Sequence, residues 1–410
     1  MKILLSAFAF SPLWGSEPGV GWCWAIEMAK AHEVTVLTHR YFENHMREME
    51  TAMGKLPFEV IYFDVKPIWH RSYERYLNSQ LYALRWQWCA RSFVKRILKT
   101  RRFDLIHHLT LGTIRYPSFL QKLGVPLVAG PLGGGERAPC GFYKGVPWRE
   151  RLRELLRDGL IWSTAWDPMI HWTWGRTEVL LCRTRESLAA LPWHVRERCR
   201  LMQEIGCPAA LADEAVMPMP GADVPLRLLH VGRLLALKGM HLALPALADV
   251  TGRGVDWRLT LVGVGPMVGP LKAQASSLGI ADRIDWVGSL PRDRVMALYG
   301  QHDAFLFPSL HDSGGTVVLE SLSQGCPVLC VDLGGPPHFV DDTCGAVVPV
   351  RSGKPEPVVA GLAEVLCDWA QSRSALYALR QGALRRAREL SWPNRVQGAY
   401  ELIEAALRAR

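Results

Sequence analysis

The sequence lacks several features that define other classes of protein. No stretch approaches the roughly 20 uninterrupted apolar residues of a membrane-spanning helix, and the first residues show no secretory cleavage pattern, so we expect the protein to be made and kept in the cytosol. The ten cysteines are scattered, without a C-x-x-C pair or a histidine at zinc-site spacing. We therefore expect reduced thiols that are buried as small hydrophobic side chains.

Low-complexity segments, repeats of a short fixed period and a D-x-D metal motif are also absent from the sequence. The composition is that of an ordinary globular protein, with 49% hydrophobic and 21% charged residues, which excludes a disordered or collagen-like chain. A length of 410 residues predicts two or three domains of roughly 100 to 200 residues each.

The net charge of +9 comes entirely from the first half of the chain. Residues 1–205 contain 29 Lys and Arg against 19 Asp and Glu, whereas residues 206–410 contain 19 against 20. Within the first half, residues 55–157 hold 19 basic and 7 acidic residues. A basic face of this kind attracts nucleic acid, anionic lipid headgroups or a phosphorylated substrate.

The order of predicted elements indicates two α/β domains, each a doubly wound parallel sheet. Residues 2–7 and 33–38 predict strands on either side of an apolar helix over 22–30, with a Gly-rich loop over 15–21 before that helix. Strands and helices alternate in both halves, as in Rossmann-like domains. The further strands are predicted at 58–63, 105–108, 126–129, 226–231, 257–262, 283–286, 304–307, 328–331 and 346–348.

These patterns predict four consecutive parts of the chain. Residues 1–205 form a Rossmann-like domain, and residues 206–225, rich in Pro, Gly and Ala, form the linker. Residues 226–390 form a second Rossmann-like domain, and residues 391–410 form a helix that packs back on the first domain. Open α/β sheets bind ligands outside the carboxyl ends of their strands, so two facing domains predict an active site in a central cleft.

Two cations follow the first strand of the second domain. Arg233 and Lys238 are separated by four residues on a strand-to-helix loop that begins at Gly232. An Arg fork and a Lys ammonium can converge on a diphosphate, although two surface cations flanking a turn remain the alternative.

Two carboxylates lie near the next predicted site. The strand over 304–307 enters a Gly-containing loop with Asp312, and a helix beginning near Thr316 carries Glu320. The free amides at a helix start suit an anion, and carboxylates accept hydrogen bonds from vicinal hydroxyls. Diphosphate recognition combined with polyol recognition indicates a sugar nucleotide.

On these residues the chain resembles the retaining glycosyltransferases of the GT-B fold, specifically family 4, also described as glycosyl transferases group 1. The similarity includes Gly232-Arg233 to Lys238, the two acids eight residues apart, the segment Gly325-Cys326-Pro327-Val328-Leu329, and Trp392 in a terminal helix. The first acid departs from the family pattern, which has Glu where this chain has Asp312. The shorter side chain keeps the charge and changes its reach.

The resemblance implies transfer of a hexose from a nucleotide-diphosphate sugar to a hydroxyl of a glycan or lipid-linked acceptor, with retention of the anomeric configuration. It places this reaction in cell-surface polysaccharide assembly. Arg233 and Lys238 neutralise the donor diphosphate, Asp312 binds the sugar hydroxyls and Glu320 the ribose. Because these cations supply the positive charge, no metal and no other cofactor is expected. The donor-binding residues implied in this way are Gly19, Gly21, Gly232, Gly315, Thr316, Val317 and Glu320.

The first domain contributes further candidates. Ser16 and Glu17 lie where acceptor hydroxyls would arrive, and Glu136 follows a Gly-rich loop expected to line the cleft. A carboxylate such as Glu17 at a helix start is equally explained by the helix dipole. The family's donor-contacting histidine corresponds to His107 or His108, of which only one can face the cleft because neighbours on a strand point to opposite faces. We favour His108, with a buried structural histidine as the alternative.

Other functions predict different features. A GT-B-fold epimerase would release free sugar without an acceptor, and a phosphorylase would need a pyridoxal-binding lysine, for which we find no candidate. A basic module that binds nucleic acid would show aromatic and Gly patterning, which the basic half lacks. We therefore expect no nucleic-acid partner.

A predicted helix within residues 75–102 bears on membrane binding. Leu77, Leu81, Leu84 and Trp88 recur at helical spacing among several basic residues. Core packing explains this pattern, and so does peripheral binding to an anionic membrane surface on the cytoplasmic side, which would suit a lipid-linked acceptor.

Overall fold

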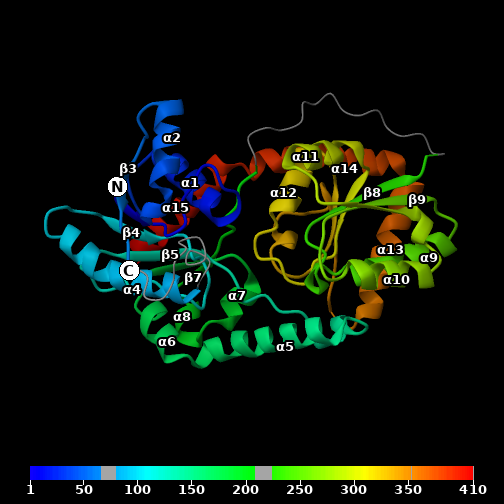
Figure 1. Cartoon of the computed structure of the whole chain (residues 1–410), viewed down its shortest axis with the longest axis horizontal. Coiled ribbons are helices and arrows are strands. Elements are labelled where there is room, and N and C mark those ends of the chain that lie inside the picture. The colour runs from blue at the N-terminus through cyan, green and yellow to red at the C-terminus, as the bar shows by residue number, and fades with distance from the viewer. Residues whose placement is uncertain (66–79, 208–223, 352, 410) are drawn as a thin grey trace. The chain divides into compact units, whose positions relative to one another are not determined.

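The computed structural model describes residues 1–65, 80–207, 224–351 and 353–409 (Figure 1). Most of the predicted linker at 206–225 lies outside these residues, and Leu77 does as well. The chain divides into two compact units. The first contains residues 1–135, 160–205 and 392–410, and the second contains residues 136–159 and 206–391.

This division differs from the expected one in a single segment. Residues 136–159, which we assigned to the first domain, group with the second unit. The reason is hydrophobic packing, because Phe142, Tyr143 and Val146 are buried in the main apolar cluster of the second unit. The sequence showed no composition change at this point, so the switch could not be read from it.

The first unit contains a seven-stranded parallel sheet in the order β3-β2-β1-β4-β5-β6-β7. Successive strands pair in parallel through crossover helices, as the alternating sequence pattern predicts. Two short strands, β6 and β7, were not predicted. The strands are β1 (Lys2–Ser6), β2 (Glu33–Thr38), β3 (Glu59–Tyr62), β4 (Leu105–His108), β5 (Leu127–Leu132), β6 (Val179–Cys182) and β7 (Cys199–Leu201).

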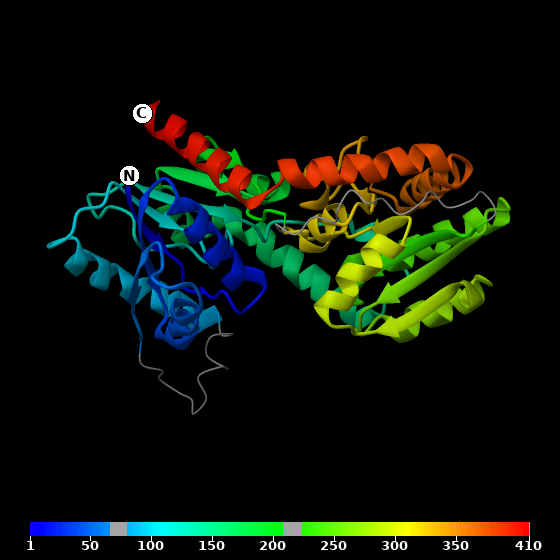
Figure 2. The ribbon, with the colours of Figure 1, turned by 90° about the horizontal axis from the view of Figure 1, so that it is seen from above.

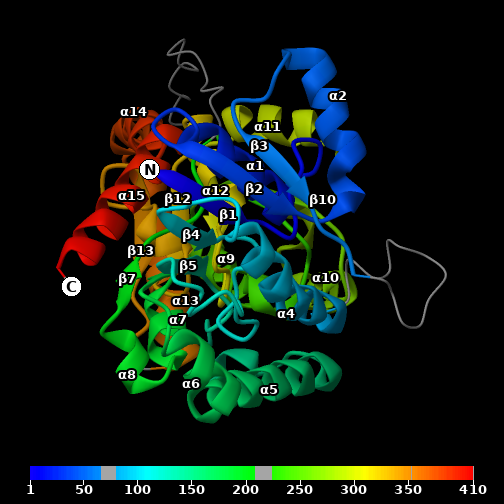
Figure 3. The same ribbon diagram turned by 90° about the vertical axis from the view of Figure 1, so that its left-hand side faces the viewer.

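Helices cover both faces of this sheet. Trp86, Ala90 and Val94 of α4 are buried with strand residues on one face, and α15 packs against α1 on the other (Figure 2). Figure 3 shows β1, β4 and β5 between α15 and α4. The α-helices of this unit are α1 (Ser16–Met28), α2 (Glu43–Met53), α4 (Gln80–Ile97), α6 (Pro168–Trp174), α7 (Arg185–Ala190), α8 (Trp193–Arg196) and α15 (Trp392–Arg408), and α5 (Trp148–Ser163) ends here.

The second unit contains a six-stranded parallel sheet in the order β10-β9-β8-β11-β12-β13. Four of its strands coincide with the predicted ranges, because short runs of Leu, Val and Phe bounded by Gly and Pro are typical of buried parallel strands. The strands are β8 (Leu226–Val231), β9 (Trp257–Val262), β10 (Ile284–Gly288), β11 (Ala304–Phe307), β12 (Val328–Val331) and β13 (Gly345–Val348).

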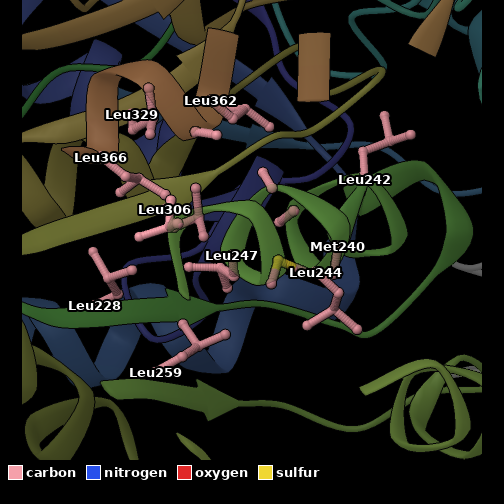
Figure 4. Close-up of a cluster of buried hydrophobic side chains, with 14 of the residues drawn as sticks. Leu228, Met240, Leu242, Leu244, Leu247, Leu259, Leu306, Leu329, Leu362 and Leu366 are labelled. Carbon is pink, nitrogen blue, oxygen red and sulfur yellow. The ribbon is translucent and has the colours of Figure 1, made fainter. Parts of the chain in front are cut away.

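Leucines fill the core between this sheet and two of its helices. Leu228, Leu259, Leu306 and Leu329 project from four neighbouring strands toward α9 and α13 (Figure 4). On the other face, α12 packs against α14 and α11. The helices of this unit are α9 (Met240–Gly252), α10 (Val268–Ser277), α11 (Arg292–Gln301), α12 (Thr316–Ser323), α13 (Pro355–Gln371) and α14 (Arg373–Glu389).

Candidate active site

Four loops meet at the carboxyl edge of the second unit's sheet. They follow β9, β8, β11 and β12, which are neighbours in the parallel sheet, so the loops emerge side by side. Backbone hydrogen bonds join them: Leu234 N donates to Val264 O at 3.0 Å, and Gly335 N donates to Asp312 O at 2.7 Å. This edge carries most of the candidate residues that the sequence singled out.

Lys238 and Asp312 connect the loops after β8 and β11. Lys238 Nζ donates to Asp312 Oδ2 at 2.5 Å and lies 5.0 Å from the centroid of the Phe307 ring. The other carboxylate oxygen, Oδ1, accepts from the amides of Gly314 at 3.1 Å and Gly315 at 2.9 Å. Asp312 therefore holds both the ammonium group and the start of α12.

These contacts set the ionisation of Asp312. Burial opposes the charged form, but the Lys238 ammonium and the amides of Gly315 and Gly314 outweigh it, so the pKa of Asp312 lies below its ordinary value. We expected this carboxylate to bind sugar hydroxyls, yet both of its oxygens have partners within the protein. In the structure Asp312 is a positioning residue for Lys238.

Arg233 lies on the same loop as Lys238 and is exposed. Within the described parts of the chain, its guanidinium has no recorded hydrogen bond or ion pair. Gly232, which precedes it, has φ of +152°, a backbone conformation that favours glycine. The guanidinium N–H groups of Arg233 are therefore open to a ligand.

Glycines allow the four loops to pack backbone against backbone. A Cβ on Gly263 would stand 1.9 Å from Gly232 O, and a Cβ on Gly239 would stand 1.9 Å from Pro308 O. The G-x-G at Gly263 and Gly265 is explained by this packing, because a Cβ on Gly265 would also meet Leu234 O at 2.2 Å.

Replacing Gly239 with Ala should destabilise the second unit far more than the matched change at Gly279. Both glycines have left-handed backbone, with φ of +70° and +69°, but a Cβ at Gly279 meets nothing within 4 Å. The backbone strain is common to both variants, so the collision with Pro308 O accounts for an extra loss of about 2 kcal/mol in G239A. Urea denaturation of both variants measures the difference in the free energy of unfolding. Equal losses would show that the loops at Gly239 and Pro308 can move apart at little cost.

The start of α12 faces the same edge. Gly315 is its N-terminal cap, with φ of +63°, and Thr316 and Val317 occupy the first turn, where amides lack intrahelical partners. Glu320 is buried further along the helix, and its Oε1 accepts from Arg292 Nε at 3.0 Å and Nη2 at 2.9 Å. Sequence reasoning missed Arg292, because a partner 28 residues away on another helix leaves no local pattern.

A buried histidine next to Lys238 was also missed. His230 stacks with Phe305 and Phe307, and its Nδ1 lies 2.9 Å from Leu306 O. Burial first, and then the Lys238 charge, lower the pKa of His230 to about 4. The imidazole is therefore neutral, and its Nε2 has no hydrogen-bond partner among the described residues. A histidine inside an apolar strand gives no signal that separates it from core.

In the first unit, the predicted Gly-rich loop at 15–21 is helical. The helix α1 begins at Ser16, six residues earlier than expected, so Gly19 and Gly21 lie inside it. A Cβ on Gly19 would stand 2.6 Å from Trp14 O, and one on Gly21 would stand 3.0 Å from Ala9 O. These glycines allow the preceding loop to pack on the helix, which offsets their poor helix propensity.

The two acceptor-side candidates of α1 differ in exposure. Ser16 is exposed, with φ of +58°, whereas Glu17 is half-buried and accepts a hydrogen bond from Gly112 N at 3.0 Å. Glu17 therefore holds the loop that follows β4. Glu136, the third candidate, is buried and belongs to the second unit, not to the first as expected.

His107 and His108 are both fully buried on β4. His107 bridges elements, since Nδ1 lies 2.9 Å from the Tyr400 hydroxyl and Nε2 lies 2.8 Å from Gly130 O. His108 points to the opposite face, beside the Trp174 ring. Burial, and then the neighbouring His107, lower the pKa of His108 to about 3. Without exposed surface, His108 does not present its ring to a substrate, in contrast to our expectation.

No group of three or more His, Cys, Asp or Glu among the described residues is arranged to hold a metal ion. None of the helices described is long and apolar enough to cross a membrane.

A known protein family matches residues within the second unit. Residues 222–380 match the family described as Glycosyl transferases group 1. This part of the chain is similar to the glycosyl transferases group 1 family. The match covers all four loops described above, together with Arg233, Lys238, Asp312 and Glu320.

Curated relatives match over limited parts of the chain. A 2-deoxystreptamine glucosyltransferase from Streptomyces kanamyceticus is 33% identical over 128 residues, which cover 31% of this chain and 32% of the relative. A putative colanic acid biosynthesis glycosyltransferase, WcaL, from Escherichia coli is 27% identical over 170 residues, covering 37% and 42%. A D-inositol 3-phosphate glycosyltransferase from Segniliparus rotundus is 31% identical, covering 43% and 39%. The matched segments span about a third to two fifths of these relatives.

Solved structures match over nearly the whole length. The lipopolysaccharide outer core galactosyltransferase WaaB aligns with a TM-score of 0.61 at 14% identity, covering 99% of both chains. Anabaena HepE, in complex with UDP, aligns with a TM-score of 0.57 at 16% identity, covering 99% of this chain and 100% of that one. At these identities the likeness shows the fold: the chain has the GT-B fold, as the sequence predicted.

Proposed function

We propose that this chain is a retaining glycosyltransferase of family 4 that transfers a hexose from a nucleotide-diphosphate sugar to a hydroxyl of a glycan or lipid-linked acceptor. One observation carries the proposal: Lys238, fixed by Asp312 at 2.5 Å, stands at the start of α12 on the same loop as the open guanidinium of Arg233. Two cations and a helix N-terminus suit a diphosphate.

The chemistry follows from where charge develops. As the bond between the anomeric carbon and the diphosphate oxygen breaks, its electron pair leaves with the diphosphate. The acceptor hydroxyl oxygen bonds to the anomeric carbon on the same face of the sugar, and its proton passes to the departing diphosphate oxygen. Arg233 and Lys238 stabilise the negative charge that builds on the departing group. In this proposal these side chains supply the positive charge, and neither a metal nor another cofactor is assigned.

The other donor contacts are assigned to the same edge. The amides of Thr316 and Val317 bind the phosphates or the sugar, and Gly232 and Gly315 allow close backbone approach, with the Gly315 amide held by Asp312. Glu320, oriented by Arg292, binds the ribose hydroxyls. Among the first-unit candidates, the exposed Ser16 stays assigned to the acceptor side.

The comparisons support the donor class and the setting. HepE, which shares the fold, is in complex with UDP, and relatives include a putative enzyme of colanic acid biosynthesis. We place this chain in cell-surface polysaccharide assembly, working from the cytoplasm at the inner face of the membrane, without a nucleic-acid partner.

Titration calorimetry with UDP, GDP, ADP and dTDP, followed by radiolabelled transfer to a lipid or glycan extract, tests the proposal. We expect one nucleoside diphosphate to bind and the label to enter an acceptor with its anomeric configuration retained. Failure to bind any of the four would contradict the proposal. Release of free sugar without an acceptor would instead favour the epimerase alternative.

A further inference from the structure

The helix α5 turns its apolar side chains outward. Trp148, Leu152, Leu155, Leu156 and Leu160 recur at three- and four-residue spacing, and all are exposed. Trp148 has 69% of its surface accessible and Leu156 has 62%. A contiguous exposed apolar stripe of this kind marks a surface that binds another protein or a membrane.

The opposite side of α5 is acidic and buried, which fixes the orientation of the helix. Glu150, Glu154 and Asp158 are buried, and Glu154 Oε2 lies 2.6 Å from His311 Nε2. Burial opposes the charge of Glu154, but His311 outweighs it and keeps the pKa of this carboxyl below its ordinary value. Rotating α5 to hide its leucines would break this buried pair, which is costly.

Arginines border the apolar stripe and indicate what covers it. Arg149, Arg151 and Arg153 are exposed, and the Arg149 guanidinium lies 5.5 Å from the Trp148 ring. A second copy of the chain meeting this stripe would bring like charges together, which is unfavourable. Anionic lipid headgroups complement the arginines, while the leucines and tryptophan suit the acyl boundary.

Tryptophans continue beyond the C-terminal part of α5. Trp162 and Trp166 are exposed, and their ring centroids lie 6.5 Å apart. Trp166 lies in the 3-10 turn Thr164–Trp166 that leads to α6. Tryptophan favours the region between headgroups and acyl chains, because its ring is apolar and its N–H is polar.

The helix α4, whose sequence pattern is compatible with membrane binding, is less suited to it than α5. On α4, Leu81 and Trp88 are exposed, but Trp86, Ala90 and Val94 are core residues. The stripe on α4 thus has fewer described exposed apolar positions than the stripe on α5.

We propose that α5 lies flat in the headgroup region of an anionic bilayer, with Trp148, Leu152 and Leu156 inserted and the flanking arginines on lipid phosphates. This surface is distinct from the residues assigned to sugar transfer. Its test needs no enzymatic activity, so the outcome does not depend on the proposed function.

Flotation of the full chain with vesicles tests the proposal. We expect the chain to float with phosphatidylcholine vesicles that contain phosphatidylglycerol, and less so at high salt or without phosphatidylglycerol. The double variant L152E/L156E should partition about tenfold more weakly or worse, because it places charge where apolar surface is buried. R149Q/R151Q should lose mainly the preference for anionic vesicles.

The matched control is V287E/L402E, which adds two charges at exposed apolar residues of β10 and α15. It should float like the unchanged chain, and all variants should keep the same melting temperature because the positions are exposed. Absence of flotation at low salt, or unchanged flotation of L152E/L156E, would overturn the proposal. Loss of flotation in L81E/W88E alone would show that the membrane-binding surface lies on α4. If the unchanged chain does not bind vesicles but forms a dimer that L152E/L156E loses, a second copy of the chain covers the apolar stripe of α5.

Discussion

Replacing Arg233 with alanine should weaken nucleoside diphosphate binding by about tenfold to a hundredfold, which corresponds to the loss of charge-assisted hydrogen bonds to phosphate. Arg233 is exposed, and its guanidinium is not engaged by other described residues, so the melting temperature should stay unchanged. Calorimetric titration of the unchanged chain and of R233A with the diphosphate that binds best measures the ratio of dissociation constants.

Arg253 provides the control, because it is an exposed arginine of the same unit that pairs with Asp249 on α9. R253A should bind the diphosphate as the unchanged chain does. The salt dependence of binding should fall in R233A and stay the same in R253A. Equal affinity of R233A and the unchanged chain would remove Arg233 from the donor site.

The second large effect concerns the stability of the site. Replacing Asp312 with Ala should lower the free energy of unfolding by about 3 kcal/mol, because Lys238 then keeps a largely buried charge without its partner and two amides lose their acceptor. Asp312→Asn keeps an acceptor for the amides and should lose about half as much. Urea denaturation of both variants measures the difference.

The pH dependence of this effect has a definite sign. The pKa of Asp312 is lower in the folded chain than its ordinary value of 3.8, so its contribution is fully present above that value. The contribution is lost as the pH falls below 3.8 and through the lower, folded pKa. The stability of the unchanged chain should therefore drop more steeply than that of D312N in this acid range. Parallel curves for the two proteins would show that Lys238 does not stabilise the Asp312 charge.

Much of the fold was predictable because buried parallel strands are short apolar runs between Gly and Pro. The ranges 226–231, 257–262, 304–307 and 328–331 needed no correction. The start of α1 was missed since Gly19 and Gly21 disfavour a helix locally, and only the tight approach of Trp14 and Ala9 explains them. The transfer of residues 136–159 to the second unit depends on long-range packing of Phe142 and Tyr143, which has no local pattern.

The grouping of the candidate residues at one sheet edge was predictable, and their contacts were less so. Arg233, Lys238, Asp312 and the start of α12 do meet at one edge, because neighbouring parallel strands deliver their loops there. The carboxylates have protein partners that the sequence did not reveal, since Lys238 holds Asp312 and Arg292 holds Oε1 of Glu320. Sequence spacing identifies which groups can be close, but the geometry of a particular oxygen depends on side chains from distant elements.

The hydrogen bond between His107 and Tyr400 joins residues 293 positions apart, within a unit assembled from three separate stretches of chain. During synthesis, His107 Nδ1 on β4 cannot pair with the Tyr400 hydroxyl until residues 392–410 have left the ribosome. The second unit, whose residues all come before Trp392, can complete its core earlier. A released chain that ends at Ser391 should thus resist protease in residues 206–391 while residues 1–135 are still digested.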